Sequence, residues 1–525
     1  MNGLTKKVPG KFVQYILSID VGTTSLKTLL LEKNGTIIAS CNNEYPLIQR
    51  KAGWAEQDPA CWWEAALNGI ASVIKNGGIS PDKISCIGLS GQFQSLVMLD
   101  KNGKVIRDAI LWCDQRSKEI LPLINQKVGE EDLIKHTANS AMVGSTVSLL
   151  LWVRANEPEI YSCCAHIMLP HEYLRYRLTG EYAADVTAAS SMQLLNIPER
   201  RWSKEVMNKL EIDPSLTGTL VECCDLVGKV TQTASLETGL APGIPVVGGG
   251  GDSVVSGLGT GIVRAGSCFT SIGTSGIIMA STDTIPIDRL GCGVSTYCAA
   301  VPGKWVSITC SNAAGISLRW LRDICFTSEI KETEKKGKSP YQLMDELAKD
   351  IPPGADGLLF LPYLWGDRTP HQDPDARGVF FGLSTLHTRS HMVRAVLEGV
   401  AYSLLDGISV LEELGITLSD FLLCGGGVRS ILWRQIIADI YGKPVTTVQN
   451  DDGAAVGAAV LAAAGAGMYS DVAQACDAMI HRNPSEPYRP ENHGKYIHYA
   501  GLYRKLYIQL KNMFQELKEI TKNYS

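Results

Sequence analysis

The sequence has no apolar run long enough to cross a membrane. A spanning helix needs about 20 apolar residues, but the most apolar window, 454–466, is shorter and is interrupted by two glycines. The stretch 1–11 contains three lysines and no apolar segment of the kind that a secretory signal requires. We therefore expect a cytoplasmic protein without a membrane partner, in which 454–466 forms a buried helix of small residues.

An excess of charge of one sign is also missing. The formal net charge is −5, from 49 Lys and Arg against 54 Asp and Glu, and the two signs are interspersed. No basic stripe is available for a phosphate backbone, so nucleic acid is not an expected partner. None of the 15 cysteines stands in a C-x-x-C pair with zinc spacing. The class that remains is a globular protein that acts on a small molecule.

The length of the chain requires more than one domain. At 525 residues it exceeds the roughly 250 to 300 residues at which a single hydrophobic core stops growing. Four glycines, Gly248–Gly251, stand near the midpoint, directly before Asp252 and a stretch of small residues that ends at Gly261. We place the boundary there and expect an N-terminal domain at 15–259 and a C-terminal domain at 260–525.

Both halves show alternating strand and helix patterns. YILSID at 15–20 is an apolar run that leads through a Gly/Thr turn into a second apolar run, which predicts a β-hairpin. SCFTSIGTSGIIMA at 267–280 repeats this outline. Apolar residues at helical spacing predict helices over 59–75 and 391–414. The alternation predicts an α/β fold in each half, with the first architecture repeated in the second.

Two Gly/Thr loops are candidates for binding phosphate. Phosphoryl transfer requires N–H groups and hydroxyls for the phosphates, a carboxylate for magnesium and a base for the acceptor hydroxyl. A glycine lets the backbone approach an oxyanion. One such loop is equally compatible with a plain strand-ending turn, but its repetition favours the phosphate interpretation. The candidate residues are Asp20, Gly22, Thr23 and Thr24 in the first loop and Gly273 and Thr274 in the second.

Asp252 is the candidate general base. It follows four glycines, so its backbone can come close to a substrate, and the residues after it can begin a helix. The alternative is that its carboxylate only caps that helix. The two roles are compatible, because a helix N-terminus favours the charged form of a carboxylate, which is the form that accepts a proton.

Gly425–Gly427 is another glycine-rich turn. It ends an apolar run and precedes Ser430, Trp433 and Arg434 on an expected helix, an arrangement that suits a flat adenine against the backbone. The alternative is a tight strand-to-helix turn without a ligand. The glycines alone do not decide between the two.

Taken in order, these motifs resemble those of the FGGY carbohydrate kinases. The segment GVFFGLSTLHTRSHMVRAVLE at 378–398 fits the C-terminal signature of that family position by position, and the resemblance extends from Tyr15 to the C-terminus. Within the family the chain is most similar to the xylulokinases, through the segments 53–63, 150–160, 360–383 and 424–440.

The resemblance implies two ribonuclease-H-like domains of the actin-like ATPase type, with a catalytic cleft between them and with ATP and Mg²⁺ as cofactors. It places Asp20 near the magnesium ion, through water, and Asp252 at the acceptor hydroxyl as the base. By the same resemblance, the phosphates contact Gly22, Thr23, Thr24, Gly273 and Thr274, and the nucleoside lies against Gly425, Gly426 and Gly427.

The chain departs from the family pattern where a sugar is chosen. Gln94 replaces the histidine that usually touches sugar hydroxyls, although a glutamine can still donate and accept hydrogen bonds. Asp114 belongs to a W-x-D-x-R pattern and either binds hydroxyls or pairs with Arg116, and Leu149 stands where the family usually has lysine. The predicted sugar-binding residues are Gln92, Phe93, Gln94, Asp114 and Asp252.

The resemblance therefore predicts an ATP-dependent kinase that phosphorylates a terminal hydroxyl of a ketopentose, D-xylulose or a close relative. Two alternatives stay open. The first is the same chemistry on another polyol, ketose or aldonate, and the second is a sugar-responsive protein of this fold that does not transfer phosphate. The expected partner is a small-molecule sugar or polyol, and a homodimer is left open.

Overall fold

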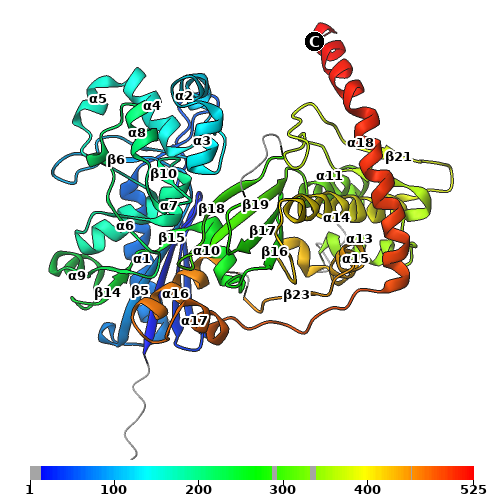
Figure 1. Cartoon of the computed structure of the whole chain (residues 1–525). Coiled ribbons are helices and arrows are strands. Elements are labelled where there is room, and N and C mark those ends of the chain that lie inside the picture. The colour runs from blue at the N-terminus through cyan, green and yellow to red at the C-terminus, as the bar shows by residue number, and fades with distance from the viewer. Residues whose placement is uncertain (1–13, 287–291, 331–338, 451, 525) are drawn as a thin grey trace, which may run out of the picture. The chain divides into compact units, whose positions relative to one another are not determined.

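The structure is a computed structural model that describes residues 14–286, 292–330, 339–450 and 452–524 (Figure 1). The chain divides into two compact units, which are not contiguous in sequence. The first unit holds the residues up to 261 together with 298–303 and 452–480, and the second holds 262–297, 304–451 and 481–525. The contiguous domain ranges predicted above, 15–259 and 260–525, stay a sequence-level proposal.

The first unit is built on a mixed sheet of seven strands. The order along the sheet is β13-β14-β5-β1-β2-β3, and the short strand β15 also pairs with β5. The strands β14, β1 and β15 run parallel to β5, whereas β2 and β3 continue from β1 as an antiparallel meander. The bounds are β1 (Tyr15–Val21), β2 (Ser25–Glu32), β3 (Ile37–Glu44), β5 (Ile84–Gly91), β13 (Leu226–Lys229), β14 (Pro245–Val247) and β15 (Gly250–Gly251).

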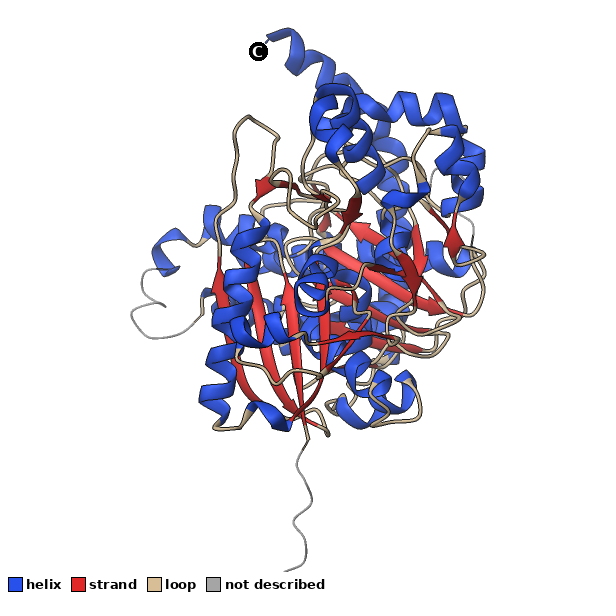
Figure 2. Cartoon of the chain, turned by 90° about the vertical axis from the view of Figure 1, so that its left-hand side faces the viewer, coloured by secondary structure: helices blue, strands red, loops and turns tan. Residues whose placement is uncertain are grey.

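Helices from distant parts of the chain cover this sheet. Figure 2 shows helices, in blue, against the red strands. The predicted helix at 59–75 is confirmed as α1, which starts where Asp58 accepts the N–H of Ala60 at 2.9 Å and Pro59 takes the first helical position. The helices that carry residues of the argument below are α1 (Pro59–Gly77), α4 (Thr146–Asn156), α6 (Pro170–Thr179), α7 (Val186–Ser191), α9 (Gln232–Thr238), α10 (Asp252–Gly259), α16 (Gly453–Gly465) and α17 (Val472–Met479).

The small-residue segment at 454–466 is the buried helix that the sequence predicts. As α16 it packs on β1, β5 and α10, and Figure 1 shows it in orange beside the blue strands. The approach is close: a Cβ on Gly88 of β5 would lie 2.0 Å from the carbonyl oxygen of Ala458. Only small residues on both sides allow that distance. Within the described ranges, no helix has both the length and the hydropathy needed to cross a bilayer.

The second unit repeats the strand pattern of the first. Its sheet has the order β18-β19-β17-β16-β22-β23, with an antiparallel β16-β17-β19 meander and with β22 and β23 parallel to β16. The predicted repetition of the architecture is therefore present. The bounds are β16 (Ser267–Ile272), β17 (Gly276–Thr282), β18 (Ser295–Cys298), β19 (Trp305–Ser311), β22 (Asp420–Cys424) and β23 (Val445–Thr447).

Long and short helices complete the second unit. The predicted helix at 391–414 is confirmed as α14, most of which is buried. The helices of this unit that bear on the argument are α11 (Gly315–Cys325), α13 (Pro340–Ala348), α14 (Arg389–Glu413), α15 (Ile431–Tyr441) and α18 (Pro490–Tyr524). The remaining short elements that bear on the site are β9 (Ala183–Asp185), which pairs with β12 (Thr219–Val221) in the first unit, and the turn Gly426–Arg429 in the second.

Candidate active site

Three parallel strands of the first unit end side by side. Asp20 near the end of β1 is in register with Ser90 of β5, and Ser90 is in register with Gly250 of β15. Because the carboxyl ends of parallel strands share one edge of the sheet, the residues that follow them gather there. Asp20 on β1 and Asp252, directly after β15, are brought together in this way.

Asp20 has an unsatisfied oxygen. Its Oδ1 atom is buried and, among the described residues, has no hydrogen-bond partner. Burial raises the pKa of Asp20 to about 6, even though Ser90, His171 and Lys27 act to lower it. An orphaned buried carboxylate oxygen is costly unless a cation or a cation-bound water satisfies it. The donor therefore fits a hard divalent cation such as Mg²⁺, which prefers oxygen ligands and keeps several waters.

The first Gly/Thr loop, Gly22–Thr24, is fixed by its carbonyl groups. The Gln57 side chain donates to the carbonyl oxygen of Thr23 at 2.7 Å, and the hydroxyl of Tyr45 donates to that of Gly22. The indole N–H of Trp112 donates to Thr23 Oγ1 at 3.0 Å. Since Thr23 Oγ1 accepts that bond, its own proton stays available for a phosphate oxygen.

Asp252 is the first residue of α10 and does not occupy the capping position, which belongs to Gly251. Asp252 Oδ1 accepts the N–H of Ser253 at 2.6 Å and its hydroxyl at 3.2 Å. Burial and then the charge of Asp20 raise the pKa of Asp252 to about 7, against a smaller lowering effect of Ser253. A base works best when its pKa lies near the working pH, so this shift is compatible with the predicted general-base role.

All four glycines before Asp252 are closely packed, since a Cβ at any of them would lie less than 3.0 Å from a neighbouring atom. A Cβ on Gly251 would lie 1.5 Å from the ring of Phe93, and Gly249 has a φ of +76° with its Cβ position 2.4 Å from the carbonyl oxygen of Leu89. The run therefore lets β15 lie flat against β5 and the Phe93 ring. That contact determines where α10, and with it Asp252, begins.

The predicted sugar-side residues occupy different environments. Gln92 is 1% exposed, and its side chain lies 3.5 Å from the carbonyl oxygen of Gly22, so it supports the first loop. Gln94 is half-buried with a φ of +63°, a conformation that non-glycine residues rarely adopt. Its backbone N–H donates to Ser191 Oγ at 3.4 Å and its side-chain amide contacts Met142 Sδ at 3.8 Å.

Asp114 is fully buried, and both its oxygens are engaged. Oδ1 accepts the backbone N–H and Nε of Arg116, and Oδ2 accepts the guanidinium of Arg116 and the backbone N–H of Ala55. The Arg116 guanidinium lies 3.6 Å from the ring centroid of Trp54 and 4.9 Å from that of Trp152. The geometry favours the pairing alternative, in which Asp114 fixes the chain that carries Trp112.

Leu149 lies fully buried in the apolar core formed by α4 and its neighbours. A lysine ammonium at this depth requires a partner or a path to water. The leucine therefore matches its surroundings in this chain.

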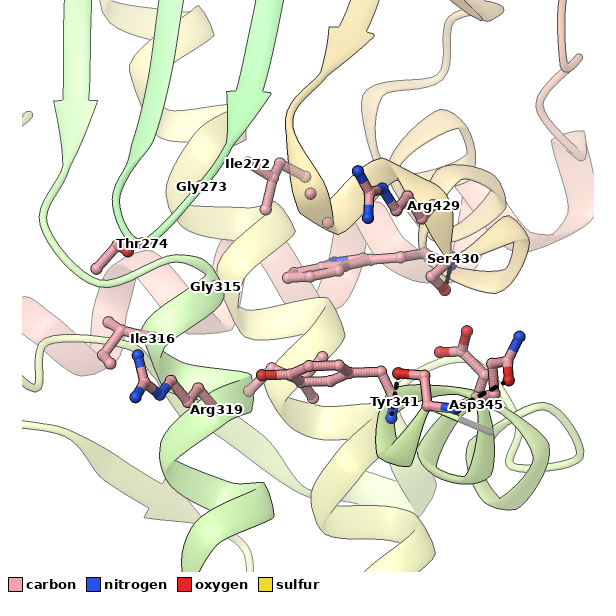
Figure 3. Close-up of a pocket in the computed structure, with 16 residues that line it drawn as sticks. Ile272, Gly273, Thr274, Gly315, Ile316, Arg319, Tyr341, Asp345, Arg429 and Ser430 are labelled. Carbon is pink, nitrogen blue, oxygen red and sulfur yellow. Dashed lines mark hydrogen bonds between the residues drawn. The ribbon is translucent and has the colours of Figure 1, made fainter. Parts of the chain in front are cut away.

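The second Gly/Thr loop borders a cavity of about 470 Å³ in the second unit (Figure 3). The carbonyl oxygen of Gly273 accepts the N–H of Gly315 at 2.9 Å, and that of Thr274 accepts the N–H of Ile316 at 3.1 Å, so the loop is joined to the start of α11. The lining residues come from this loop, from α11, from 339–345 on α13 and its start, and from 426–433.

Two glycines of the predicted triplet, Gly426 and Gly427, line this cavity, whereas Gly425 precedes them outside the lining. Gly425 has a φ of +85°, and Gly427 is packed so tightly that a Cβ would lie 2.5 Å from the side chain of Ile272. Gly426 has open space where a Cβ would stand. The triplet thus combines two packed glycines with one that leaves room at the cavity, as expected for a wall that a flat ligand can approach.

Tyr341 and Asp345 are cavity residues that the sequence does not identify. The hydroxyl of Tyr341 accepts a bond from Arg322 at 2.9 Å, which fixes the ring, and Figure 3 shows that ring across the cavity from Arg429 and Ile272. Burial raises the pKa of Asp345, although the Ser430 hydroxyl acts to lower it. The only sequence signal was the Ser-Pro start of a helix directly after a charged stretch, which is common at solvent-exposed helices.

Two models of one protein family match the chain. The model of the N-terminal domain of the FGGY family of carbohydrate kinases matches residues 15–259, and the model of its C-terminal domain matches residues 268–466.

Similar proteins extend over nearly the whole chain. A xylulose kinase of Bacillus subtilis (strain 168) is 34% identical over 97% of this chain and 100% of its own length. A gluconokinase of the same organism is 33% identical over 85% of this chain and 86% of its own length. The crystal structure of a xylulose kinase from Rhodospirillum rubrum superposes with a TM-score of 0.88 at 30% identity, covering 96% of this chain and 100% of that one. The predicted two-domain α/β fold is confirmed.

Proposed function

The chain belongs to the FGGY family of carbohydrate kinases, and from this membership we propose that it transfers the γ-phosphoryl group of ATP to a terminal primary hydroxyl of D-xylulose or a closely related ketopentose. The observation that carries the proposal is the pairing of Asp20 and Asp252 at one sheet edge. Asp20 can hold a metal ion through water and Asp252 can accept the proton of the acceptor hydroxyl, and phosphoryl transfer requires both functions.

Asp252 is the proposed base. As the acceptor oxygen attacks the γ-phosphorus, a new O–P bond forms and the bond to the bridging oxygen of ADP breaks. The proton of the acceptor hydroxyl passes to the Asp252 carboxylate. Ser253 holds Oδ1 through two hydrogen bonds, and this fixes the carboxylate for that transfer. A positioned base of this kind contributes about 10² to 10⁴ to the rate.

Asp20 is the proposed holder of magnesium, through water. The ion, when bound, neutralises charge on the β- and γ-phosphate oxygens. Asp20 Oδ1 is the orphaned acceptor that such a water satisfies. Thr23 and Thr24 follow directly, and we propose that their hydroxyls donate to phosphate oxygens.

We place the nucleoside in the cavity of the second unit. The purine ring would lie beside the Tyr341 ring, which stands across the cavity from Ile272 and Arg429 in Figure 3, and Gly426 also lines this cavity. Gly273 and Thr274, at the edge of the same cavity, are the proposed contacts of the phosphates. A volume of about 470 Å³ lies in the range of small-molecule sites.

Two observations support a ketopentose as the proposed substrate. Xylulose kinases match this chain over nearly its full length. In addition, the side chains that contact Gln94, namely Ser191, Met142 and Thr146, are uncharged, which suits hydroxyls better than a carboxylate. The gluconokinase likeness makes an aldonate the second candidate.

A coupled assay of ADP release with Mg·ATP tests the proposal over ketopentoses, aldopentoses, hexuloses, polyols and aldonates. We expect the highest kcat/KM with D-xylulose. Turnover restricted to an aldonate would keep the phosphoryl transfer and replace the substrate. ADP release that ignores every sugar would contradict a sugar kinase and favour a regulatory or ATPase role.

A further inference from the structure

A chain of buried hydrogen bonds leads from His171 to the residue before Asp252. His171 Nε2 lies 2.7 Å from Asp185 Oδ2, and the Thr187 hydroxyl donates to Asp185 Oδ1 at 2.5 Å. The backbone N–H of Gly251 in turn donates to Thr187 Oγ1 at 2.9 Å. The side chains of His171, Asp185 and Thr187 are 0% exposed. This series of hydrogen bonds joins three separate segments of the first unit.

We propose that Thr187, held by Asp185 and His171, is a positioning residue that fixes Gly251 and thereby the carboxylate of Asp252. This inference rests on the proposed function, because it requires Asp252 to be the base. Thr187 contacts neither a substrate nor the reacting atoms in this proposal. It acts only through the backbone that precedes the base.

The hydrogen bonds around Asp185 determine in which direction the Thr187 hydroxyl donates its proton. Asp185 Oδ1 also accepts the backbone N–H groups of Thr187 at 3.0 Å and Ala188 at 2.9 Å, so it caps α7. Because an anion surrounded by donors accepts the hydroxyl proton, the Thr187 oxygen is left to accept the N–H of Gly251. The bonds of Asp185 and Thr187 thus restrain both side chains, although His171 Nδ1 has no hydrogen-bond partner among the described residues.

A second buried contact holds the other end of the same glycine run. Arg175 of α6 is 0% exposed, and its guanidinium donates to the carbonyl oxygens of Gly248 and Ala183. Gly248 and Gly251 are thus each tied to a buried side chain. The run that leads to Asp252 is fixed at both ends, although four glycines in sequence are the least restrained backbone a chain can offer.

The group is better explained as support than as a metal site. Donor atoms of His171, Glu172 and Asp185 lie within 4.8 Å of one another. However, the two oxygens of Glu172 already accept the backbone N–H groups of Leu169 at 2.7 Å and Asp185 at 3.2 Å. These bonds account for the Glu172 carboxylate without an ion, so we interpret the group as a structural network.

The network also lies against the strand end itself. A Cβ on Gly91 of β5 would be 3.0 Å from Cβ of His171, and Gly91 is the partner of both Val21 and Gly251 in the sheet. His171 therefore covers the point where the strands carrying Asp20 and Asp252 meet. Moving the network would displace the base relative to the metal-binding carboxylate.

The test variant is Thr187→Val, which keeps the shape of the side chain and removes only the hydroxyl. We expect kcat to fall by about tenfold to a hundredfold, because misplacement of a reacting group by about 1 Å has effects of that size. KM for ATP should stay within about twofold, since no residue of the nucleotide cavity belongs to the network. Thr187→Ser, which restores the hydroxyl, should recover most of kcat.

Thr238→Val is the matched control. Thr238 is 5% exposed, accepts the N–H of Leu240 at 3.2 Å and donates to the carbonyl oxygen of Ala234 at 2.6 Å, so it has the same kind of bonds away from the site. Its loss should lower the melting temperature as Thr187→Val does and leave kcat unchanged. If Thr187→Val does not fold, Thr187→Cys, a weaker donor and acceptor, replaces it in every comparison.

A double-mutant comparison separates this inference from the proposed function. In an Asp252→Asn background, Thr187→Val should have no further effect on kcat, because the group it positions is gone. An equal loss in both backgrounds, or a kcat for Thr187→Val equal to that for Thr238→Val, would overturn the inference and leave the base assignment intact. A normal kcat for Asp252→Asn alone would contradict the base assignment itself.

Discussion

The two sheets share one strand order but end in different chemistry. Asp20-Val-Gly-Thr-Thr in the first unit aligns with Ser271-Ile-Gly-Thr-Ser in the second, and the two hairpins occupy the same place in their sheets. Asp20 is in register with Ser90, and Ser271 is in register with Cys424. A carboxylate stands at the strand end in the first unit and a neutral hydroxyl in the second.

The two sheets also diverge beyond these register pairs. In the first unit β5, the parallel neighbour of β1, pairs with β15, which leads to the half-buried carboxylate of Asp252. In the second unit β22, the parallel neighbour of β16, itself leads to Gly426 and open space where its Cβ would stand. The repeated scaffold therefore provides two Gly/Thr loops, and the first lies at a sheet edge where two acids, Asp20 and Asp252, follow or end the strands. The comparison teaches that the fold sets the place of a site and the residues at the strand ends set its role.

The largest expected effect comes from removing the base that distinguishes the first unit. Asp252→Asn should lower kcat by about 10² to 10⁴, because the amide cannot accept the proton of the hydroxyl. The amide oxygen can still accept the two bonds from Ser253, so the fold should be retained. Sugar-dependent ADP release measures the loss, and circular dichroism checks the fold. Near-normal turnover would show that the two units do not differ in the way we propose.

The second-largest effect on activity is expected when Asp20, which precedes the first Gly/Thr loop, is replaced by the serine that precedes the second. Asp20→Ser gives both loops the same leading residue and removes the orphaned oxygen. We expect a loss of about 10- to 100-fold in kcat/KM at low magnesium, the usual effect of removing a group that acts on a metal through its bound ligand. Raising the magnesium concentration should restore part of it. A titration of activity against Mg²⁺ measures both.

The reciprocal variant, Ser271→Asp, is the control for that exchange. It adds a negative charge beside the loop proposed to contact phosphates, so KM for ATP should rise while the Mg²⁺ requirement stays as in the wild type. If both exchanges gave the same response to magnesium, the loops would have equal roles and the comparison would fail.

Sequence alone predicts the local features of this comparison. Both hairpins, the helix α1 and the small-residue helix α16 follow from patterns within about 15 to 20 consecutive residues, over which hydrophobic periodicity is informative. The family resemblance adds roles for Asp20, Asp252 and the glycine loops. These roles stay predictions, although the geometry brings the two acids together.

Contacts between distant segments are what the sequence does not show. Asp114 Oδ2 accepts the backbone N–H of Ala55, which is 59 residues away in the sequence, and this bond favours pairing over sugar binding. The backbone N–H of Gly251 donates to Thr187 Oγ1, and these residues are 64 positions apart. Tyr341 reaches the cavity only because α13 packs beside α11 and α14. No short pattern specifies such pairings, because they arise from the topology of the whole sheet and not from local propensity.

A smaller effect is expected at the cavity of the second unit, where we propose that the nucleoside binds. Tyr341→Ala should raise KM for ATP by about tenfold, since stacking of a base on an aromatic ring contributes roughly 1 to 3 kcal/mol. KM for the sugar should not change. Tyr341→Phe, which keeps the ring and loses the bond to Arg322, should change KM for ATP by no more than about threefold. Initial rates at varied ATP and varied sugar separate the two constants.

The smallest effect concerns stability, and it tests the electrostatic side of the comparison. The pKa of Asp252 is raised to about 7 in the folded protein, above its ordinary value of 3.8. Between those two values the folded state binds more protons than the unfolded state, so the free energy of unfolding of the wild type falls as pH rises through this interval. The asparagine in the Asp252→Asn variant cannot ionise, so this fall in the free energy of unfolding is absent from the variant.

Asp252→Asn should therefore equal the wild type in stability near pH 4 and exceed it above pH 7. Because the side chain is only half-buried, we expect a difference in the free energy of unfolding of about 1 to 2 kcal/mol at pH 8, less than the same rise in pKa would give in a fully buried group. Urea unfolding at several pH values measures the difference.

Asp100→Asn is the control with the opposite sign. The backbone N–H of Lys104 and then the turn residue Asn102 lower the pKa of Asp100, so its charged form favours folding above pH 4. Replacing it should reduce stability at pH 8, with the difference fading on acidification. If both variants shifted stability in the same direction with pH, the charge on Asp252 would not oppose folding. The first unit would then not differ from the second in having a charged side chain at its strand ends that opposes folding.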